Sequence, residues 1–354
     1  MTKKVAVVIL NYNGRALMEK FLPSVTDYSG DAEIVVVDNR STDDSVDFLR
    51  ERFPDVRLIV NEENGGFAKG YNDGLKHVEA EYYMLLNSDV EVTPGWLDPI
   101  VRLLDSDHEV AAVQPKILSH AEPEKLEYAG AAGGYIDSLA YPFCRGRLFD
   151  HTEKDSETYA DTRPVFWATG AALMVRSDVF RQLGGFDEDF FAHMEEVDLC
   201  WRIHRMGRKV YYCGESSVYH VGGGTLAQGN PRKTYLNFRN SLSVLYLNTK
   251  GRHLLWKMPL RLGLDMVAAL RFFGGGVPGD GKAVLKAFRD FTLSFAEHRK
   301  KRKKRKKSLA FVSDAPTQYR GLIVFDYFVR KKSRFSDLGF QSEEKNARTS
   351  TGFS

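Results

Sequence analysis

Three carboxylates crowd into four positions of the segment HMEEVDLCWR, which spans residues 193–202. Glu195, Glu196 and Asp198 stand there among aromatic and aliphatic residues of the kind that fill a core. Like charges held close together raise one another's pKa, and a carboxyl group with a raised pKa can accept a proton from a substrate near neutral pH. The alternative is an acidic helix start, which the helix dipole stabilises. The segment predicts one of these two arrangements.

A second group of residues could hold a divalent cation. Asp89 and Glu91 follow the apolar run YYMLLN, and a carboxylate at the end of a strand is well placed to hold Mg²⁺ or Mn²⁺ against a diphosphate. An acidic turn that closes a strand is the alternative. His220 ends the apolar run SSVYH. A lone histidine is usually structural, but beside Asp89 it would complete a site suited to Mn²⁺.

Two further segments could bind a nucleotide. Asp38 ends the run EIVVVD and could accept a hydrogen bond from the imide N–H of uracil or thymine, although an Asx turn or a helix cap explains it equally well. In NGGFAKGYNDG, residues 64–74, small residues would let the backbone approach phosphates and Lys69 would add charge. Glycine-rich loops are common, so this signal is weak alone. The dinucleotide fingerprint GxGxxG does not follow the first apolar run.

The elements that must position these residues alternate in type along the first 90 residues. Short apolar runs without in/out alternation lie at 5–10, 33–38, 56–61 and 82–87. Such runs are typical of parallel strands buried on both faces. Segments with helical spacing separate them, the first with a Ser41/Thr42 cap. The pattern predicts an α/β fold with an open, mostly parallel, twisted sheet flanked by helices, in which ligands bind beyond the carboxyl ends of the strands.

Farther along, the chain predicts more strands and a helix. FWATGAALMV, residues 166–175, is typical of a glycine-interrupted strand, and SDVFRQLGGF after it predicts a capped helix that ends at Gly184 and Gly185. KVYYCGESSVYHVGG, residues 209–223, predicts two short strands separated by Gly214.

Past about residue 230 the character of the chain changes. Within LLWKMPLRLGLDMVAALRFF, residues 254–273, four charged residues fall on one arc of a helix and apolar residues fill the rest. Four charges argue against a spanning helix, and their clustering favours an amphipathic one. The clustered residues are Lys257, Arg261, Asp265 and Arg271.

A basic tract follows a second, aromatic-rich helix expected over 282–297. RKKRKKRKK, residues 299–307, turns a mildly acidic chain into one with a net charge of +3. The tract and the amphipathic segment together predict association with an anionic membrane surface, because basic residues are attracted to it. The alternative is a helix packed on the preceding domain plus a solvated tail. A nucleic-acid binder would spread its positive charge over a folded face, so no nucleic-acid partner is expected.

Composition sets the remaining bounds. At 354 residues the chain can hold one large domain or two ordinary ones. Three cysteines, Cys144, Cys200 and Cys213, lack CxxC spacing, so we expect neither a disulfide framework nor a zinc cluster, and we expect a reducing compartment. The start MTKKVAVVIL predicts a strand and lacks the long apolar region of a signal peptide.

The order of these motifs resembles the family-2 glycosyltransferases of the GT-A fold, and within them the bacterial rhamnosyltransferase-like members. The resemblance covers roughly residues 3–250 and rests on NYNG, VVVDNRSTDD, NGGFAKGYN, LLNSDVEV, TGAALMV, GGFDEDFFAHMEEVDLCWR and YHVGG, in that order. It implies a catalytic domain over 1–250, an amphipathic and polybasic membrane-association region over 251–310, and a C-terminal extension over 311–354 whose end is expected to be mobile.

The resemblance also implies roles for single residues. Asp38 would recognise the base, Asp89 and His220 would hold Mg²⁺ or Mn²⁺, and Glu196 would be the general base, with Glu195 and Asp198 contacting acceptor or donor. Nucleotide contacts would come from Asn11, Tyr12, Asp38, Asn64, Gly66, Lys69, Asn72 and Ser88, and contacts to acceptor or sugar from Trp167, Gly170 and Trp201. Two positions depart from the family's pattern: Asn87 stands where a strict DxD motif has aspartate, and Glu196 where many relatives have aspartate.

The implied reaction is an inverting transfer of a sugar from a nucleoside diphosphate to a hydroxyl of a glycan or lipid-linked acceptor in cell-surface polysaccharide synthesis. dTDP-rhamnose or a UDP-sugar is the expected donor, with GDP-mannose less favoured, and the expected place is the cytoplasmic face of the cell membrane. Two alternatives stay open: a degenerate scaffold that only binds, and a nucleotidyltransferase. A processive synthase is disfavoured because the sequence has no QxxRW motif and no spanning segment.

Overall fold

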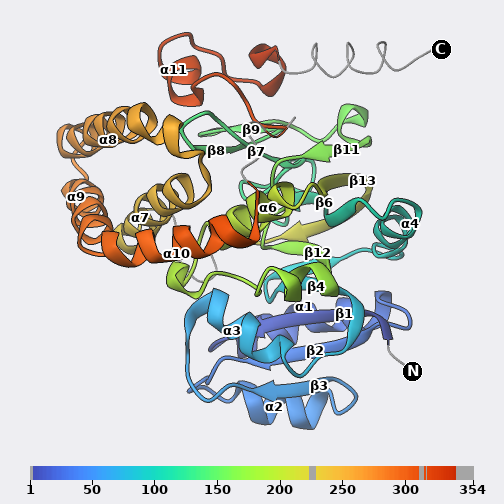
Figure 1. Cartoon of the computed structure of the whole chain (residues 1–354). Helices are drawn as coiled ribbons and strands as arrows, with labels where there is room; N and C mark the ends of the chain where they lie inside the picture. The colour runs from blue at the N-terminus through green and yellow to red at the C-terminus, as the bar shows by residue number, and fades with distance from the viewer. Residues whose placement is uncertain (1–2, 223–228, 311–314, 316, 340–354) are drawn as a thin grey trace.

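The computed structural model describes residues 3–222, 229–310, 315 and 317–339. The expected mobility of the end of the chain concerns residues 340–354, which lie outside this range, as does Gly223 at the end of the segment predicted as two strands over 209–223. Figure 1 shows a central sheet with helices on both faces and a group of helices to the left.

The central sheet has nine strands in the described part of the chain. Four neighbouring strands are parallel: β3 (Arg57–Val60), β2 (Glu33–Asp38), β1 (Lys3–Asn11) and β4 (Ala80–Asn87). The sheet continues beyond β4 with β12 (Ala172–Arg176), β6 (Val110–Ser119), β13 (Lys209–His220) and β11 (Thr162–Val165), while β5 (Val90–Val92) pairs with β13. β12 runs antiparallel to its neighbours and β6 runs parallel to β13. The predicted α/β class with a mostly parallel sheet is confirmed.

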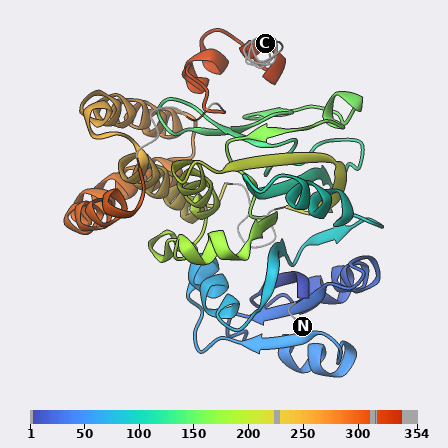
Figure 2. The same cartoon turned by 45° about the vertical axis from the view of Figure 1, so that its right-hand side comes forward.

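Helices cover both faces because the strands bury side chains on both. On one face Val7 and Ile9 of β1 share a core with Met18 and Leu22, and on the other Val8 shares a core with Tyr71. The first face carries α1 (Arg15–Tyr28), α2 (Ser45–Arg52) and α4 (Asp98–Ser106), and the second carries α3 (Gly66–Leu75), α5 (Ser177–Gln182) and α6 (Glu195–Arg205). Figure 2 shows the same layers from the side. The uninterrupted apolar runs of the sequence follow from this double burial.

A smaller antiparallel sheet and the C-terminal segment lie above the central sheet in Figure 1. The small sheet contains β7 (Gly134–Ile136), β8 (Pro142–Cys144), β9 (Arg147–Leu148) and β10 (His151–Thr152). The C-terminal segment packs on it through Phe335, whose ring lies 4.8 Å from that of Tyr135. That segment contains α11 (Ile323–Phe328) and the 3₁₀ helix η3 (Phe335–Leu338); two more 3₁₀ helices are η1 (Glu157–Tyr159) and η2 (Glu188–Phe190).

Three predicted element boundaries were wrong. Helix α2 begins at Ser45, because Ser41 accepts a hydrogen bond from the Asn13 amide 2.9 Å away and does not cap a helix. The strand expected over 166–175 is shorter and ends one residue later, since β12 spans Ala172–Arg176. The two strands expected around Gly214 are one strand, β13, with a register shift between Cys213 and Ser217.

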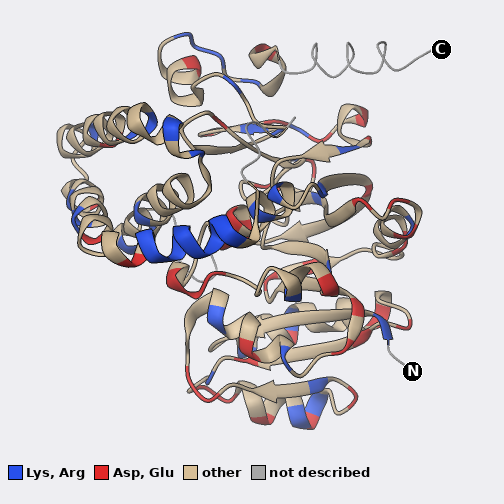
Figure 3. Ribbon diagram, in the orientation of Figure 1, with Lys and Arg blue, Asp and Glu red and all other residues tan. Residues whose placement is uncertain are grey.

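The C-terminal helices form what we call the bundle: α7 (Pro231–Asn248), α8 (Gly251–Gly274), α9 (Pro278–Leu293) and α10 (Phe295–Ser308). The single helix expected over 282–297 is divided at Ser294, and the basic tract is helical as part of α10, shown in blue in Figure 3. The tract is therefore not a solvated tail. Within the described ranges, no helix combines the length and the apolar character needed to cross a bilayer.

Candidate active site

The turn after β1 and the end of β2 form the first part of the site. Asp38 is fully buried and accepts a hydrogen bond at each carboxylate oxygen, from the Asn11 amide at 3.0 Å and from the Ser41 backbone at 2.8 Å. A β-carbon at Gly14 would lie only 2.3 Å from Oδ1 of Asn11, so this turn requires glycine. Tyr12 lies 45% exposed beside Asn11. The structure thus brings together Asn11, Tyr12 and Asp38, as predicted.

The glycine-rich segment packs differently from the prediction. Gly66 has a φ of +80°, and a β-carbon there would lie 2.5 Å from the ring of Phe191. The backbone amide of Phe67 donates to the Phe191 carbonyl at 2.6 Å. Asn64 accepts hydrogen bonds from Asn39 and from the Gly66 amide. The glycine therefore makes room for the loop before α6, and the expected approach of its backbone to phosphates stays a prediction.

Lys69 and Asn72 of α3 are occupied by contacts within the protein. Lys69 pairs with Glu63, at 3.3 Å, and with Asp73. Asn72 donates to the Phe186 carbonyl at 2.9 Å and to Glu188 at 3.1 Å, and it accepts from the Phe186 amide at 2.9 Å. The Asn72 amide holds the segment that leads to α6, and its nucleotide contact stays a prediction.

Asp89 and His220 meet at the ends of β4 and β13. Oδ1 of Asp89 lies 3.1 Å from Nε2 of His220, and Oε2 of Glu127 lies 3.3 Å from Nδ1 of the same ring. The side-chain amide of Asn87 is 3.5 Å from Nε2. Burial alone would lower the pKa of His220, but Asp89 and Glu127 outweigh it and raise the pKa to about 10. The predicted pairing of Asp89 with His220 is present.

The residues present fit a divalent cation. In the part of the chain that is described, no three histidine, cysteine or carboxylate side chains converge into a metal cluster, so Asp89 and His220 would be two ligands and phosphate oxygens would complete the shell, as is typical of Mg²⁺. The carboxylate oxygen and imidazole nitrogen that lie 3.1 Å apart could bind one cation together, and both are donor types that Mn²⁺ accepts. Glu127 at Nδ1 would direct Nε2 toward the metal. Sequence reasoning missed Glu127, which no motif marks.

Ser88 lies close to the turn after β1, which carries the predicted nucleotide-binding residues Asn11 and Tyr12. A β-carbon at Gly14 would be 3.9 Å from Oγ of Ser88, so the turn after β1 and the turn after β4 are neighbours. Parallel strands β1 and β4 bring these turns together because Leu10 pairs with Asn87. The structure therefore joins the predicted nucleotide and metal residues at one edge of the sheet.

The loop that leads into α6 is unusual in its backbone. Phe191, His193 and Met194 have φ values of 61°, 68° and 73°, a region that non-glycine residues rarely adopt and that clusters at functional sites. Asn240 of α7 holds the loop by donating to the carbonyls of Phe190, Ala192 and His193, at 3.0, 2.9 and 2.7 Å. One buried amide thus fixes the position from which α6 starts, and nothing in the sequence pointed to it.

Glu195 and Glu196 begin α6 with free carboxylate oxygens. Oε2 of each is buried and has no hydrogen-bond partner among the described residues. Burial raises the pKa of Glu196 to about 7, and burial followed by the charge of Glu196 raises the pKa of Glu195. The raised pKa that the sequence predicted is present for Glu196, but its main cause is burial and not the repulsion expected from Glu195 and Asp198. A carboxyl group with this pKa can serve as a base near neutrality.

Asp198 has a different role from the predicted contact with acceptor or donor. Its fully buried carboxylate accepts from Arg202 at 2.8 Å, from Arg305 at 2.6 and 3.0 Å, and from Asn248 at 2.8 Å. Burial alone would raise the pKa of Asp198, but Arg305 and Arg202 outweigh it and hold the pKa far below its usual range. Asp198 therefore joins α6 to α7 and α10 and is unavailable to a substrate.

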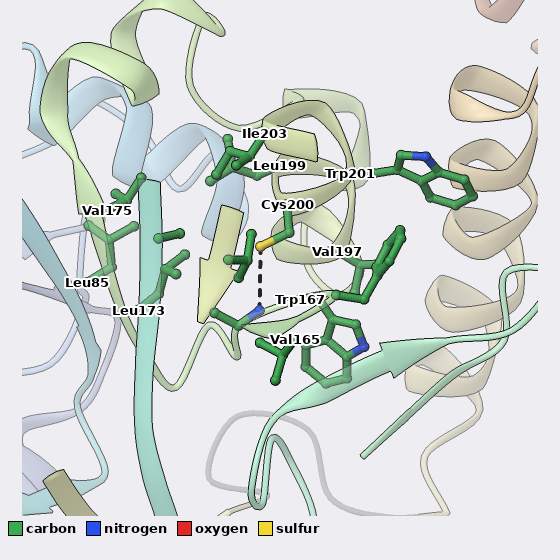
Figure 4. Close-up of a cluster of buried hydrophobic side chains, with 14 of the residues drawn as sticks. Leu85, Val165, Trp167, Leu173, Val175, Val197, Leu199, Cys200, Trp201 and Ile203 are labelled. Carbon is green, nitrogen blue, oxygen red and sulfur yellow. Dashed lines mark hydrogen bonds between the residues drawn. The ribbon is translucent and has the colours of Figure 1, made fainter. Parts of the chain in front are cut away.

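The two tryptophans predicted to contact acceptor or sugar belong to the core. Trp201 is 6% exposed and packs edge-on against Phe166 with ring centroids 5.3 Å apart. Trp167 is equally buried and donates from Nε1 to the Tyr135 carbonyl at 2.8 Å. Figure 4 draws both within a cluster of buried hydrophobic side chains, with Trp201 on the side of α6 that faces away from Leu173 and Val175. Gly170 stays near the site, since a β-carbon there would lie 3.3 Å from the ring of Phe67.

The acidic groups of the site act on a common neighbour. Burial raises the pKa of the Cys144 thiol; Arg147 and the Gly130 backbone oppose this, and the carboxylates of Glu127 and Glu196 add to it more weakly. The arrangement can stabilise a departing anion on one side and accept a proton on the other.

Known proteins of one family are similar to this chain. The model of the family described as Glycosyl transferase family 2 matches residues 6–180. N-acetylglucosaminyl-diphospho-decaprenol L-rhamnosyltransferase of Mycobacterium tuberculosis is 26% identical over 77% of this chain and 92% of its own length. O-antigen biosynthesis protein RfbC of Myxococcus xanthus is 30% identical over 57% of this chain and 16% of its own length.

A solved structure shares the fold. The crystal structure of GalNAc-T7 with UDP, GalNAc and Mn²⁺ matches with a TM-score of 0.56 and 18% identity, over 71% of this chain and 49% of that one. The likeness confirms the predicted GT-A type of sheet. The chain belongs to glycosyl transferase family 2, through a domain that covers residues 6–180 and has rhamnosyltransferase-like homologues.

Proposed function

We propose that the protein transfers a sugar, with inversion, from a nucleoside-diphosphate donor to a hydroxyl of a glycan or lipid-linked acceptor in cell-surface polysaccharide synthesis. One observation carries the proposal: Glu196 has a buried carboxylate oxygen without a hydrogen-bond partner among the described residues, and a pKa of about 7. Such a group is largely ionised at slightly alkaline pH and still basic enough to take a proton from a hydroxyl.

A pyrimidine nucleotide is the proposed donor component. The two oxygens of Asp38 each accept one hydrogen bond from the protein, from Asn11 and Ser41, and a carboxylate oxygen can accept a second. An imide N–H of uracil or thymine can supply it. dTDP-rhamnose is favoured by the name of the mycobacterial relative, an L-rhamnosyltransferase whose name also gives a diphospho-decaprenol acceptor. UDP-sugars are the other candidates.

Departure of the nucleoside diphosphate requires positive charge near its developing negative charge. Asp89 and His220 would hold Mg²⁺ or Mn²⁺, which supplies that charge to the diphosphate oxygens. Glu127 would keep the His220 ring in the orientation that presents Nε2. The Mn²⁺ in the solved structure of GalNAc-T7 is consistent with this role.

Glu196 would act on the acceptor. Its carboxylate takes the hydroxyl proton as the acceptor oxygen bonds to the anomeric carbon, and the anomeric C–O bond to the diphosphate breaks on the opposite face with its electron pair. The configuration inverts, the proton remains on Glu196, and the nucleoside diphosphate leaves. General-base help of this kind contributes about 10²–10⁴-fold to the rate.

Thermal stability of the purified protein with UDP, dTDP, GDP and ADP, each with Mn²⁺ or with EDTA, tests the donor site. We expect a Mn²⁺-dependent rise for one pyrimidine diphosphate, which is lost in Asp89→Ala. Release of the nucleoside diphosphate from the matching sugar donor then tests turnover.

Three outcomes would contradict the proposal. No shift with any nucleotide would favour the degenerate scaffold. Binding without release of nucleoside diphosphate, with or without acceptor, would do the same. Release of pyrophosphate from a nucleoside triphosphate and a sugar phosphate would identify a nucleotidyltransferase.

A further inference from the structure

Three charged residues of helix α8, Lys257, Arg261 and Asp265, lie inside, whereas most of its exposed side chains are apolar. Arg261 is 2% exposed and donates to Asp265 at 2.9 Å, to the Leu139 carbonyl at 2.9 Å and to Ser241 at 2.6 Å. Its guanidinium also lies 3.7 Å from the ring centre of Tyr141. The arc of charges in the sequence is therefore used to attach α8 to the rest of the protein, which leaves its apolar arc without a partner in the described structure.

That apolar arc is long and continuous. At 100° per residue the exposed apolar side chains of α8 fall within less than half of its circumference. Leu255 is 82% exposed, Leu270 67% and Val267 61%. The full set on α8 is Leu255, Trp256, Leu260, Met266, Val267, Leu270 and Phe273. Single exposed apolar residues are ordinary, but a contiguous patch marks a surface that another phase or molecule covers.

The neighbouring helices extend the patch. Phe273 of α8 lies against α9, since a β-carbon at Gly281 would be 2.8 Å from its ring. α9 and the start of α10 add four more exposed apolar side chains, of which Leu293 is 75% exposed. These are Leu285, Phe288, Leu293 and Phe295. We call the two sets together the outer face.

The exposed charges of the bundle's last three helices are almost all positive. Across residues 251–308, eleven exposed side chains are basic and a single exposed one, Glu297, is acidic. The basic residues are Arg252, Arg271, Lys282, Lys286, Arg289, Arg299, Lys300, Lys303, Lys304, Lys306 and Lys307. The other three members of the basic tract point inward. Lys301 pairs with Asp187 and Asp189. Arg302 donates to the backbone carbonyls of residues 246 and 249, and Arg305 pairs with Asp198.

We propose that the outer face is a docking surface for an anionic lipid bilayer, into which the apolar residues of α8 and α9 insert while the exposed lysines and arginines contact lipid headgroups. A helix that lies in the interface with aromatic and aliphatic residues on one side and basic residues flanking them binds such a surface. A second copy of the chain does not fit, because two faces with the same strong positive charge repel.

Docking there would bring the active site to the membrane. The bundle lies on the side toward which strands β1, β2 and β3 run, to the left in Figure 1. Helix α7 packs against α9, and its Asn240 also holds the loop that leads into α6. Resting on the proposed function, this placement favours an acceptor anchored in the same bilayer by its lipid. The docking itself does not depend on that function.

The protein carries its own reporter for the experiment. Of its four tryptophans, Trp256 is 50% exposed on the outer face, whereas Trp96, Trp167 and Trp201 are at most 6% exposed. The full chain is mixed with vesicles of phosphatidylcholine alone or of equal parts phosphatidylcholine and phosphatidylglycerol. Sedimentation gives the partition coefficient, and tryptophan emission with brominated lipid reports insertion. We expect binding to the anionic vesicles, a blue shift, and quenching.

Two sets of substitutions separate the contributions. Leu255→Ser with Leu270→Ser should lower the partition coefficient about tenfold or more, because lipid contact with several methylene groups is lost. Lys303→Ser with Lys306→Ser spares the inward residues and should lower it roughly fivefold per charge. Tyr28→Ser, at the far end of α1, removes an exposed aromatic residue outside the bundle and should change nothing.

The proposal is overturned if the wild type does not bind anionic vesicles. It is overturned as well if the wild type binds them with no shift of Trp256 emission and the leucine variant binds with the same affinity. It is also overturned if the leucine substitutions abolish a dimer seen without lipid. Nucleotide binding is measured on the same variants without vesicles, so failure of membrane docking and failure of the proposed function are distinguishable.

Discussion

Arg305 lies at the centre of the charged contacts that support helix α6, and replacing it tests their contribution to stability. Its guanidinium bonds to both oxygens of Asp198, at 2.6 and 3.0 Å, and to Asp187 at 2.5 Å. In Arg305→Ala, Asp198 would keep Arg202 and Asn248, and Asp187 would keep Lys301. Because each acid retains one cation, we expect a loss at the lower end of the range for broken buried pairs, about 3 kcal/mol.

For a chain of 354 residues that loss corresponds to a fall in Tm of about 4 °C, since the entropy of unfolding scales with length. Lys304→Ala, which removes an exposed neighbour on the same helix, should cost less than about 0.5 kcal/mol. Calorimetry and urea unfolding of both variants measure the difference. If Arg305→Ala and Lys304→Ala unfold alike, Arg305 does not stabilise α6 in the way that we describe.

Acid stability gives a second readout of the same contact. Folding holds the pKa of Asp198 far below its usual range, so the stabilising contribution is fully present above the pKa of the unfolded chain, about 4. It disappears as the pH falls through the lower pKa of the folded state. Arg305→Ala should therefore lose less stability between neutral and acid pH than the wild type, and an equal loss in both proteins would refute the ion pair's role.

Three further predictions concern the site. Glu196→Gln should lower kcat about 10²–10⁴-fold and leave donor affinity unchanged. The wild-type kcat should fall as the pH drops below about 7, because the base must be ionised. Retained turnover in the variant would exclude Glu196 as the base. Glu127→Gln should weaken Mn²⁺ binding about 10–100-fold in titration calorimetry, whereas Glu91→Gln, at a half-exposed carboxylate, serves as the matched control; equal affinities would remove Glu127 from the metal site. Gly66→Ala should lower both kcat and Tm, since the methyl group meets the ring of Phe191; an unchanged kcat would separate that contact from catalysis.

The sequence was sufficient for the part of the site built on parallel strands. Carboxyl ends of adjacent parallel strands meet at one edge, so Asp38 after β2 and Asp89 after β4 could be expected to converge with Asn11. His220 joined them because β13 ends beside β5, an outcome that the resemblance implied and the order of strands alone did not.

Contacts between distant parts of the chain could not be predicted. Arg305 and Asp198 are 107 positions apart, and a run of nine basic residues gives no sign that one of them is buried. The same holds for Asn240, which bonds to a loop 47 to 50 positions earlier. The pattern of 254–273 predicted an amphipathic helix correctly, but periodicity does not tell which arc faces inward.

The division of α10 into inward and outward residues has an evolutionary consequence. Substitution of Lys301, Arg302 or Arg305 alters the support of α6, so these positions are held by the needs of the fold. The lysines between them, such as Lys303 and Lys304, are exposed to solvent. Under the proposed membrane docking, replacement of these lysines would change the strength of adhesion and leave the inward contacts that support α6 intact.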